Sequence, residues 1–261
     1  MKLTFLGSGT SFGVPQIGCR CAVCHSTDAR DKRTRSGAIV ESRSGTRVLI
    51  DTPPELRLQL VAAGVGSIDA VVFTHAHADH IHGIDDVRAF TMGRTTPLSM
   101  YGSVQTLADI AQRVPYILNA NMKPQPGTYK PEARAFPVQA GQDISVGDLT
   151  LVAIDIPHGS TAVFGYRAGP LGYVTDAKTI PEKAFAALQG VDTLVINALF
   201  RTPHPTHLSL PESLAVAERI GARRTYLTHL THDNFHAQLD AELPDHISPA
   251  YDGLVIDIPE E

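Results

Sequence analysis

The sequence predicts a layered α/β fold, and two observations support this prediction. Short apolar segments, each ending in a polar residue, predict strands at residues 3–6, 38–41, 47–50, 70–73, 149–156, 172–174, 194–196 and 225–227. Helix-like segments lie between some of these strands, at residues 54–63, 106–112, 181–188 and 211–220. A hydrophobic content of 43% is enough for a substantial core. We therefore expect residues 1–261 to form one mixed α/β domain in which helices cover the sheets.

Local signals refine these elements. Pro181-Glu182 and Pro211-Glu212 each place proline at the first helical position with an acidic residue behind it, a pattern typical of a helix start. Residues 115–137 are rich in Pro, Gly, Asn and Lys, and this composition predicts an irregular surface excursion.

Charge and composition limit the classes of partner. The net charge of −5 argues against a broad basic surface, so we expect no stable nucleic-acid complex. Apolar stretches fall well short of the roughly 20 residues that cross a bilayer, so no membrane is expected. The three cysteines are clustered and odd in number, which does not suggest a disulfide framework. These features predict a cytoplasmic protein with reduced thiols.

The most informative run follows the apolar segment 68–73. It contains His75, His77, Asp79 and His80, four side chains that are able to bind metal. Because an extended strand points alternate side chains in the same direction, we expect His75, His77 and Asp79 to converge where the strand ends. His80 would then point toward a second ion. Two adjacent metal ions usually indicate hydrolysis of an ester or amide.

Three further candidates stand in similar places. His158, Asp176 and His229 each follow a predicted strand, where α/β folds gather their functional groups on loops. A single histidine at a strand end is more often structural than metal-binding. Together with the first run, however, these residues predict a shared metal site.

A separate cysteine loop spans residues 18–25. Cys19, Cys21 and Cys24 follow the spacing C-x-C-x2-C, which can reach one tetrahedral zinc ion if a fourth ligand comes from elsewhere. We favour His232 as that ligand, because the nearer His25 is adjacent to Cys24 and both side chains would struggle to face one ion. Without a fourth ligand, the loop would be reactive or a chance cluster.

The order of these motifs resembles the metallo-β-lactamase superfamily. The resemblance implies a four-layer αβ/βα sandwich of two mixed β-sheets with a two-metal site at one edge. It implies that one ion is held by His75, His77 and His158, that the other is held by Asp79, His80 and His229, and that Asp176 bridges them. Asp51 matches the first motif of the superfamily and would accept a hydrogen bond from a ligand histidine. The β-lactamases themselves have cysteine where Asp176 stands, which argues against lactam cleavage.

The cysteine loop narrows the resemblance to the PhnP branch. That branch also has a histidine three residues after the last active-site histidine, as His232 follows His229 here, and residues 5–10 and 13–15 are similar to it as well. Its members are cyclic phosphodiesterases that act on phosphoribosyl 1,2-cyclic phosphate. The resemblance implies two active-site ions, Zn or Mn, and one structural Zn. It makes His207 the phosphate-contacting histidine. We expect His207 to protonate the leaving group, with His204 in the same loop as its rival, and Asp79, mainly a ligand, to accept the nucleophile's proton.

We therefore expect a phosphodiesterase that acts on a small, cyclic or nucleotide substrate. A tRNA 3′-end endonuclease shares the metal motif but carries a basic arm that is not evident here. A glyoxalase-II-type thioester hydrolase would not explain the cysteine loop. From another class, a non-catalytic metal-dependent binding protein would be indicated by a degenerate site, whereas every ligand position is filled here. Resemblance alone also suggests a homodimer.

Overall fold

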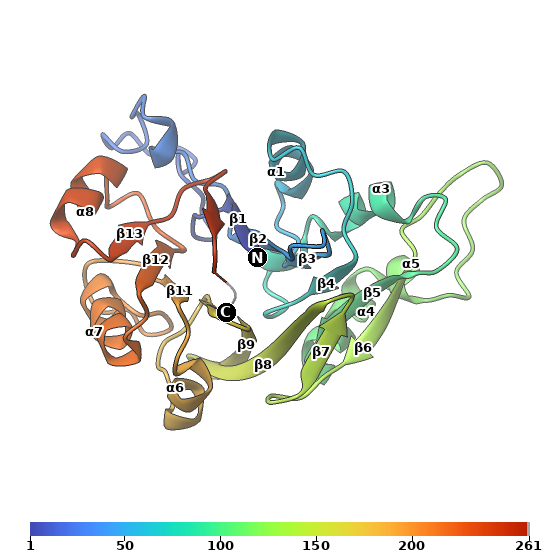
Figure 1. Ribbon diagram of the computed structural model, residues 1–261. Helices are drawn as coiled ribbons and strands as arrows, with labels where there is room; N and C mark the ends of the chain where they lie inside the picture. Colours follow the sequence, from blue (N-terminus) through green and yellow to red (C-terminus); the bar gives the residue numbers. More distant parts are fainter. Residues whose placement is uncertain (260–261) are drawn as a thin grey trace.

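The computed structural model describes residues 1–259, in which two seven-stranded sheets pack face to face (Figure 1). The first sheet has the order β14 (Val255–Asp257), β1 (Lys2–Gly7), β2 (Gly37–Glu41), β3 (Arg47–Ile50), β4 (Ala70–Val72), β5 (Leu98–Gly102), β6 (Ala133–Pro137). The second has the order β13 (Ile247–Pro249), β12 (Arg224–Thr228), β11 (Thr193–Asn197), β10 (Leu171–Val174), β9 (Thr161–Ala168), β8 (Leu149–His158), β7 (Asp143–Val146).

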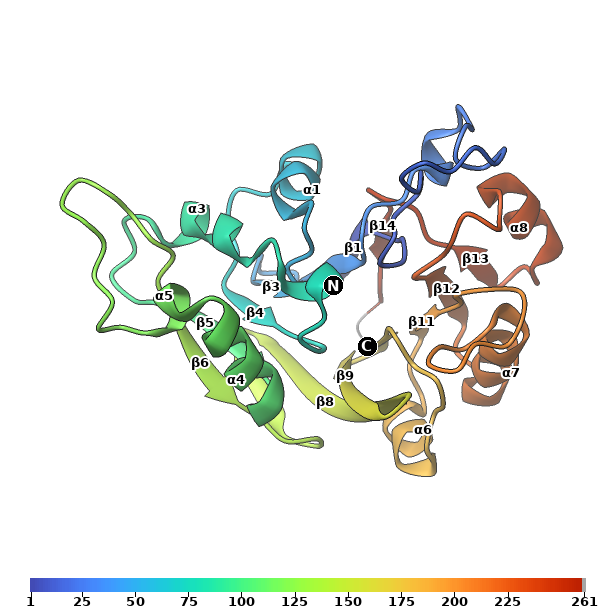
Figure 2. The ribbon, with the colours of Figure 1, turned by 180° about the vertical axis from the view of Figure 1, so that it is seen from behind.

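Helices cover the outer face of each sheet. The first half of the chain contains η1 (Ala29–Asp31), α1 (Leu56–Ala62), α2 (Ala78–Ile81), η2 (Ile84–Val87), α3 (Arg88–Thr91), α4 (Val104–Arg113) and α5 (Pro115–Leu118). Of these, α1, α4 and α5 pack on the first sheet. Those on the second sheet are α6 (Glu182–Leu188), α7 (Leu210–Ile220) and α8 (His236–Glu242). Figure 2 shows α4 and α5 against β5 and β6, with the loop 119–132 projecting beyond them. Within residues 1–259, no helix is long and apolar enough to span a membrane.

Both sheets are mixed. Strands β3 to β6 run parallel, and β14, β1, β2 and β3 pair antiparallel. In the second sheet, β10 to β13 run parallel and β7 to β10 pair antiparallel. Parallel strands lie buried between layers, which explains why β4 and β11 are apolar along nearly their whole length. This architecture confirms the predicted four-layer sandwich.

Three apolar clusters hold the layers together. The central one joins the inner faces of the two sheets and includes Phe5, Tyr166 and Tyr173. Tyr166 also donates a hydrogen bond across the sheets from its hydroxyl to the Phe73 carbonyl, at 2.6 Å. The outer clusters pack α1, α4 and α5 on the first sheet, and α6, α7 and α8 on the second. The ends of the sheets are thereby fixed relative to one another.

Local signals place the helix that precedes the last parallel strands. Ser209 caps α7 in a capping box with Glu212, and Gly221 ends the helix in the left-handed conformation with a φ of 71°. The helix therefore begins one residue earlier than the expected range 211–220. The irregular excursion predicted for residues 115–137 is wrong at both ends, because α5 and β6 lie within it. Phe136 of β6 stacks on Tyr101 of β5, at 5.3 Å between ring centroids, a contact between strands that the composition of the segment did not reveal.

Candidate active site

The predicted ligands meet at one end of the two sheets, at the last residue of β8 (His158) and on the loops that follow β3, β4, β10 and β12. Among residues 1–259, three non-glycine residues have positive φ: Asp51 at 62°, Asp176 at 58° and His229 at 57°. Each lies one or two residues beyond the end of a strand. Such backbone costs about 1–3 kcal/mol and persists where the surroundings fix it, typically at functional sites. The turns direct all three side chains into the site.

One cluster gathers His75, His77, His158 and Asp176, whose ligand atoms lie within 4.8 Å of one another. The Nε2 atom of His75 faces Nδ1 of His77 at 2.8 Å, so that two ring lone pairs converge. In His158, Nδ1 donates to the Thr206 carbonyl at 2.9 Å, which leaves Nε2 available to bind a metal ion. Hydrogen bonds of this kind orient metal-binding imidazoles.

A second cluster gathers Asp79, His80 and His229. Oδ2 of Asp79 lies 3.4 Å from Nε2 of His80 and 3.8 Å from Nε2 of His229. Asp79 therefore groups with His80 rather than with His75 and His77. The strand alternation expected for His75, His77 and Asp79 is wrong, because α2 begins at Ala78 and rotates the side chains that follow it.

Asp176 lies between the clusters and offers one oxygen to each. Oδ1 is 3.5 Å from Nε2 of His80 and 3.4 Å from Nε2 of His229. Oδ2 is 3.9 Å from Nε2 of His75. The hydroxyl of Thr175 donates to Oδ1 at 2.6 Å, which fixes the carboxylate. This is the arrangement that a bridging ligand requires.

The donor set fits two divalent cations. Nε2 of His80 and both ring nitrogens of His229 are buried without a hydrogen-bond partner within residues 1–259. Unpaired buried polar atoms are costly, and a cation beside them would remove that cost. Imidazole and carboxylate ligands suit Zn, Mn or Fe.

Electrostatics also favour cations. Burial lowers the pKa values of His75, His77 and His158, which keeps these rings neutral and able to bind metal. Burial alone would raise the pKa values of Asp79 and Asp176, but the nearby histidines overcome it and hold both values below the ordinary range. Both carboxylates are therefore ionised. Burial would lower the pKa of His80, but Asp176, Asp79 and Asp51 hold it above the ordinary range, so a cation bound here would replace the His80 proton.

Asp51 and Thr74 orient ligands of both clusters. Nδ1 of His80 donates to Oδ2 of Asp51 at 2.8 Å, and the Thr74 hydroxyl donates to the same oxygen at 2.7 Å. Because that hydroxyl is a donor to Asp51, it can accept from Nδ1 of His75, 3.0 Å away. One buried carboxylate thus fixes His80 directly and His75 through Thr74. The sequence pattern did not predict a role for Thr74, although this residue lies directly between the strand and the first histidine.

His207 lies beside the bridging carboxylate. Its Nε2 is 3.2 Å from Oδ2 of Asp176, and its Nδ1 is 2.9 Å from the Thr206 hydroxyl. Burial lowers its pKa despite the opposing effect of Asp176. His204 stands farther out, with Nδ1 3.4 Å from Nδ1 of His207. Of the two rival histidines, the structure brings His207 to the clusters.

The cysteine loop closes on His232. Nδ1 of His232 lies 3.3 Å, 3.6 Å and 3.5 Å from the sulfur atoms of Cys19, Cys21 and Cys24. The Cys24 N–H donates to the Cys21 sulfur and is the main reason that the pKa of Cys21 falls to about 7. His25 is exposed and directs Nδ1 to the Cys21 carbonyl instead. Three thiols and one imidazole around a common point fit one tetrahedral zinc ion.

Comparisons with known proteins agree with this geometry. Residues 46–230 match the beta-lactamase superfamily domain. The chain therefore belongs to the metallo-β-lactamase superfamily. A crystal structure described as a new diphosphatase from the PhnP family is 38% identical, covers 99% of this chain and 98% of its own, and has a TM-score of 0.90. Within the superfamily, the chain belongs to the PhnP family.

Two other relatives differ in name. The octanoyltransferase of Porphyromonas gingivalis is 38% identical over 266 residues, covering 100% of this chain and 52% of that protein, so the chain spans about half of its length. Coenzyme PQQ synthesis protein B of Methylorubrum extorquens is 26% identical over 225 residues, 76% of this chain and 72% of that protein.

Proposed function

We propose that this protein is a phosphodiesterase that uses two divalent cations, Zn or Mn, to hydrolyse a small phosphodiester. The observation that carries the proposal is the Asp176 carboxylate, which presents one oxygen to each histidine cluster. The 38% identical PhnP-family relative is described as a diphosphatase, and this name supports cleavage at phosphorus rather than at a carbonyl carbon. Asp176 in place of cysteine also argues against lactam cleavage.

The residues of the two clusters would have different roles in the reaction. His75, His77 and His158 would hold one ion, Asp79, His80 and His229 the other, and Asp176 both. Bound there, the ions would supply Lewis acidity toward phosphoryl oxygens and lower the pKa of water. Asp79 is kept ionised by its histidine neighbours, so its carboxylate would be in the state that can accept a proton from the attacking water.

His207 donates the proton that the leaving group needs. The Thr206 hydroxyl holds Nδ1 of His207, so that Nε2 faces the site. A histidine with a lowered pKa is a stronger acid once it is protonated, and an anionic substrate favours the protonated form. The two proton transfers thus fall to different residues: Asp79 would act on the attacking water and His207 on the leaving group. The homodimer, suggested by the resemblance, and the cytoplasmic location, suggested by the composition, stay predictions.

The test is turnover of bis-p-nitrophenyl phosphate. Protein stripped of metal and reloaded with Mn or Zn should release nitrophenol, and Asp176→Ala should reduce that rate by at least about a hundredfold. His246→Ala is the control, because His246 is exposed and outside both clusters. Metal binding without turnover would overturn the proposal in favour of a binding protein. Preferential cleavage of a tRNA 3′ extension would favour the endonuclease.

A further inference from the structure

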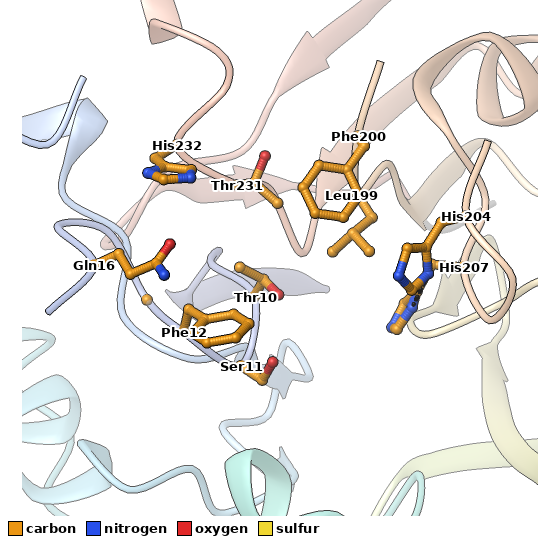
Figure 3. A pocket seen from close by; sticks show the side chains of 11 residues that line it. Thr10, Ser11, Phe12, Gln16, Leu199, Phe200, His204, His207, Thr231 and His232 are labelled. Carbon is orange, nitrogen blue, oxygen red and sulfur yellow. Dashed lines mark hydrogen bonds between the residues drawn. The ribbon is translucent and has the colours of Figure 1, made fainter. Parts of the chain in front are cut away.

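A cavity of about 330 Å³ opens directly beside His207. Figure 3 shows His204 and His207 at one end, with Gln16 and His232 at the other. Since Nε2 of His207 lies 3.2 Å from the Asp176 carboxylate, the first end borders the site at which we place the reacting phosphate. A substituent attached to that phosphate would enter the cavity.

Two phenylalanine rings flank the cavity from distant parts of the chain. Figure 3 shows Phe12, on the loop after β1, across from Phe200, which follows β11. The Phe200 ring also lies 5.5 Å from the His204 ring. Flat apolar groups on both sides suit a planar aromatic ligand, because aromatic rings prefer to stack or to meet edge to face.

Phe12 is 65% exposed, although it lies on a firmly held turn. The Gly13 N–H closes the turn on the Thr10 carbonyl at 2.8 Å, and Gly13 has a φ of 65°. The Thr10 N–H is bonded to the Leu230 carbonyl at 3.2 Å, and the Val14 N–H to the Arg33 carbonyl at 2.8 Å. The Phe12 ring contributes little to the packing of the fold, although the backbone that carries it is ordered. We therefore interpret this ring as a contact for a ligand.

Polar groups at the far end can recognise the edge of such a ring. The Gln16 amide offers both donors and an acceptor, and Thr10 and Thr231 add hydroxyl groups to the lining. The backbone N–H of Gln16 donates to the Cys24 sulfur at 3.3 Å, so the cysteine loop fixes the backbone at this end of the cavity. Donors and acceptors near a flat apolar slot are the features by which proteins read nucleobases.

We propose that this cavity binds a nucleobase, which makes nucleotide esters the substrate class. The inference rests on the proposed function for the phosphate end and deepens it. The volume is at the small end of typical ligand cavities and suits one nucleoside rather than a polymer. The net charge of −5 likewise disfavours a long polyanion. A sugar phosphate without a base would leave the exposed Phe12 ring without a ligand to contact.

The first experiment compares two esters with the same leaving group, thymidine 5′-p-nitrophenyl phosphate and methyl p-nitrophenyl phosphate. For the Mn-loaded protein, kcat/KM should be at least about tenfold higher for the thymidine ester, because one stacked base is worth roughly that factor. Phe12→Ala should bring the ratio toward one, and Phe12→Leu should restore little of it. Phe136→Ala is the control, since Phe136 lies on β6 away from the cavity, and it should keep the wild-type ratio.

The outcomes separate the two proposals. If neither ester is cleaved, the phosphodiesterase function fails. If both are cleaved with equal kcat/KM, or if Phe12→Ala leaves the ratio unchanged, the nucleobase inference fails while the function stands. Calorimetry provides a readout without turnover: adenosine monophosphate should bind at least about tenfold more tightly than ribose 5-phosphate, and Phe12→Ala should remove the difference. Equal affinities in the wild type would contradict the inference.

Discussion

Replacing Thr74 with valine tests the hydrogen-bond network that orients both clusters. The Thr74 side chain is buried, and its hydroxyl donates to the Asp51 carboxylate at 2.7 Å. A hydrogen bond to a charged group contributes about 1.5–3 kcal/mol, and we expect Thr74→Val to lower the free energy of unfolding by that amount. Each kcal/mol corresponds to roughly 2–4 °C in melting temperature for a chain of this size. His75 also loses its Nδ1 partner, so metal affinity should fall by about 10- to 100-fold.

The stability is measured by urea denaturation of chelator-treated protein, so that metal binding does not contribute, and the affinity by metal titration of the refolded chain. Thr225→Val is the matched control. Thr225 is also buried, but its hydroxyl has no hydrogen-bond partner within residues 1–259, so valine there should be neutral or stabilising. Equal losses of stability for the two variants, or an unchanged metal affinity in Thr74→Val, would refute the reasoning.

Three further perturbations address the other parts of the molecule. Cys21→Ser should lower zinc content and melting temperature first and activity only secondarily, as read by elemental analysis and thermal unfolding, with the exposed His25→Ala as control. His207→Ala should slow hydrolysis of a phosphodiester with an alkoxide leaving group by about 10²–10⁴-fold, and release of nitrophenolate, which leaves without a proton, much less. Active-site metal content should be unchanged, and lost metal would instead make His207 a ligand. Burial would raise the pKa of Glu212, but the Ser209 N–H holds it below 4.5, so Glu212 stabilises the fold above that pH and the benefit disappears as pH falls. The difference in unfolding free energy between wild type and Glu212→Gln should therefore shrink from pH 6 to pH 3.

The ligand residues could be predicted because each stands at or just after the end of a strand that the sequence marks as apolar. Asp176 and His229 follow β10 and β12, and His158 is the last residue of β8. The fold class was predicted from the same succession of strands and helices. The grouping of Asp79 could not be derived from strand periodicity, because α2 is only a four-residue helix and has no hydrophobic pattern of its own. The resemblance supplied that grouping instead.

Other features depend on contacts between distant segments. Strand β6 has the sequence Ala-Arg-Ala-Phe-Pro, without a β-branched residue, and is held by parallel pairing with β5 rather than by local preference. The cavity beside His207 was also missed, since Phe12 and Phe200 come together only when the loop after β1 meets the loop after β11. Thr74 was overlooked because a hydroxyl beside a strand carries no signal until its partners are known.

The division of the ligands between the sheets has a consequence for how the molecule matures. His75, His77, Asp79 and His80 follow a strand of the first sheet, whereas His158, Asp176 and His229 follow strands of the second. A chain in which only one of the two sheets has formed therefore has only part of the ligand set. Both metal sites can be completed only after the two sheets have packed together, and bound ions would then link one sheet to the other. Removal of the ions by a chelator should therefore weaken the packing between the two sheets before either sheet unfolds.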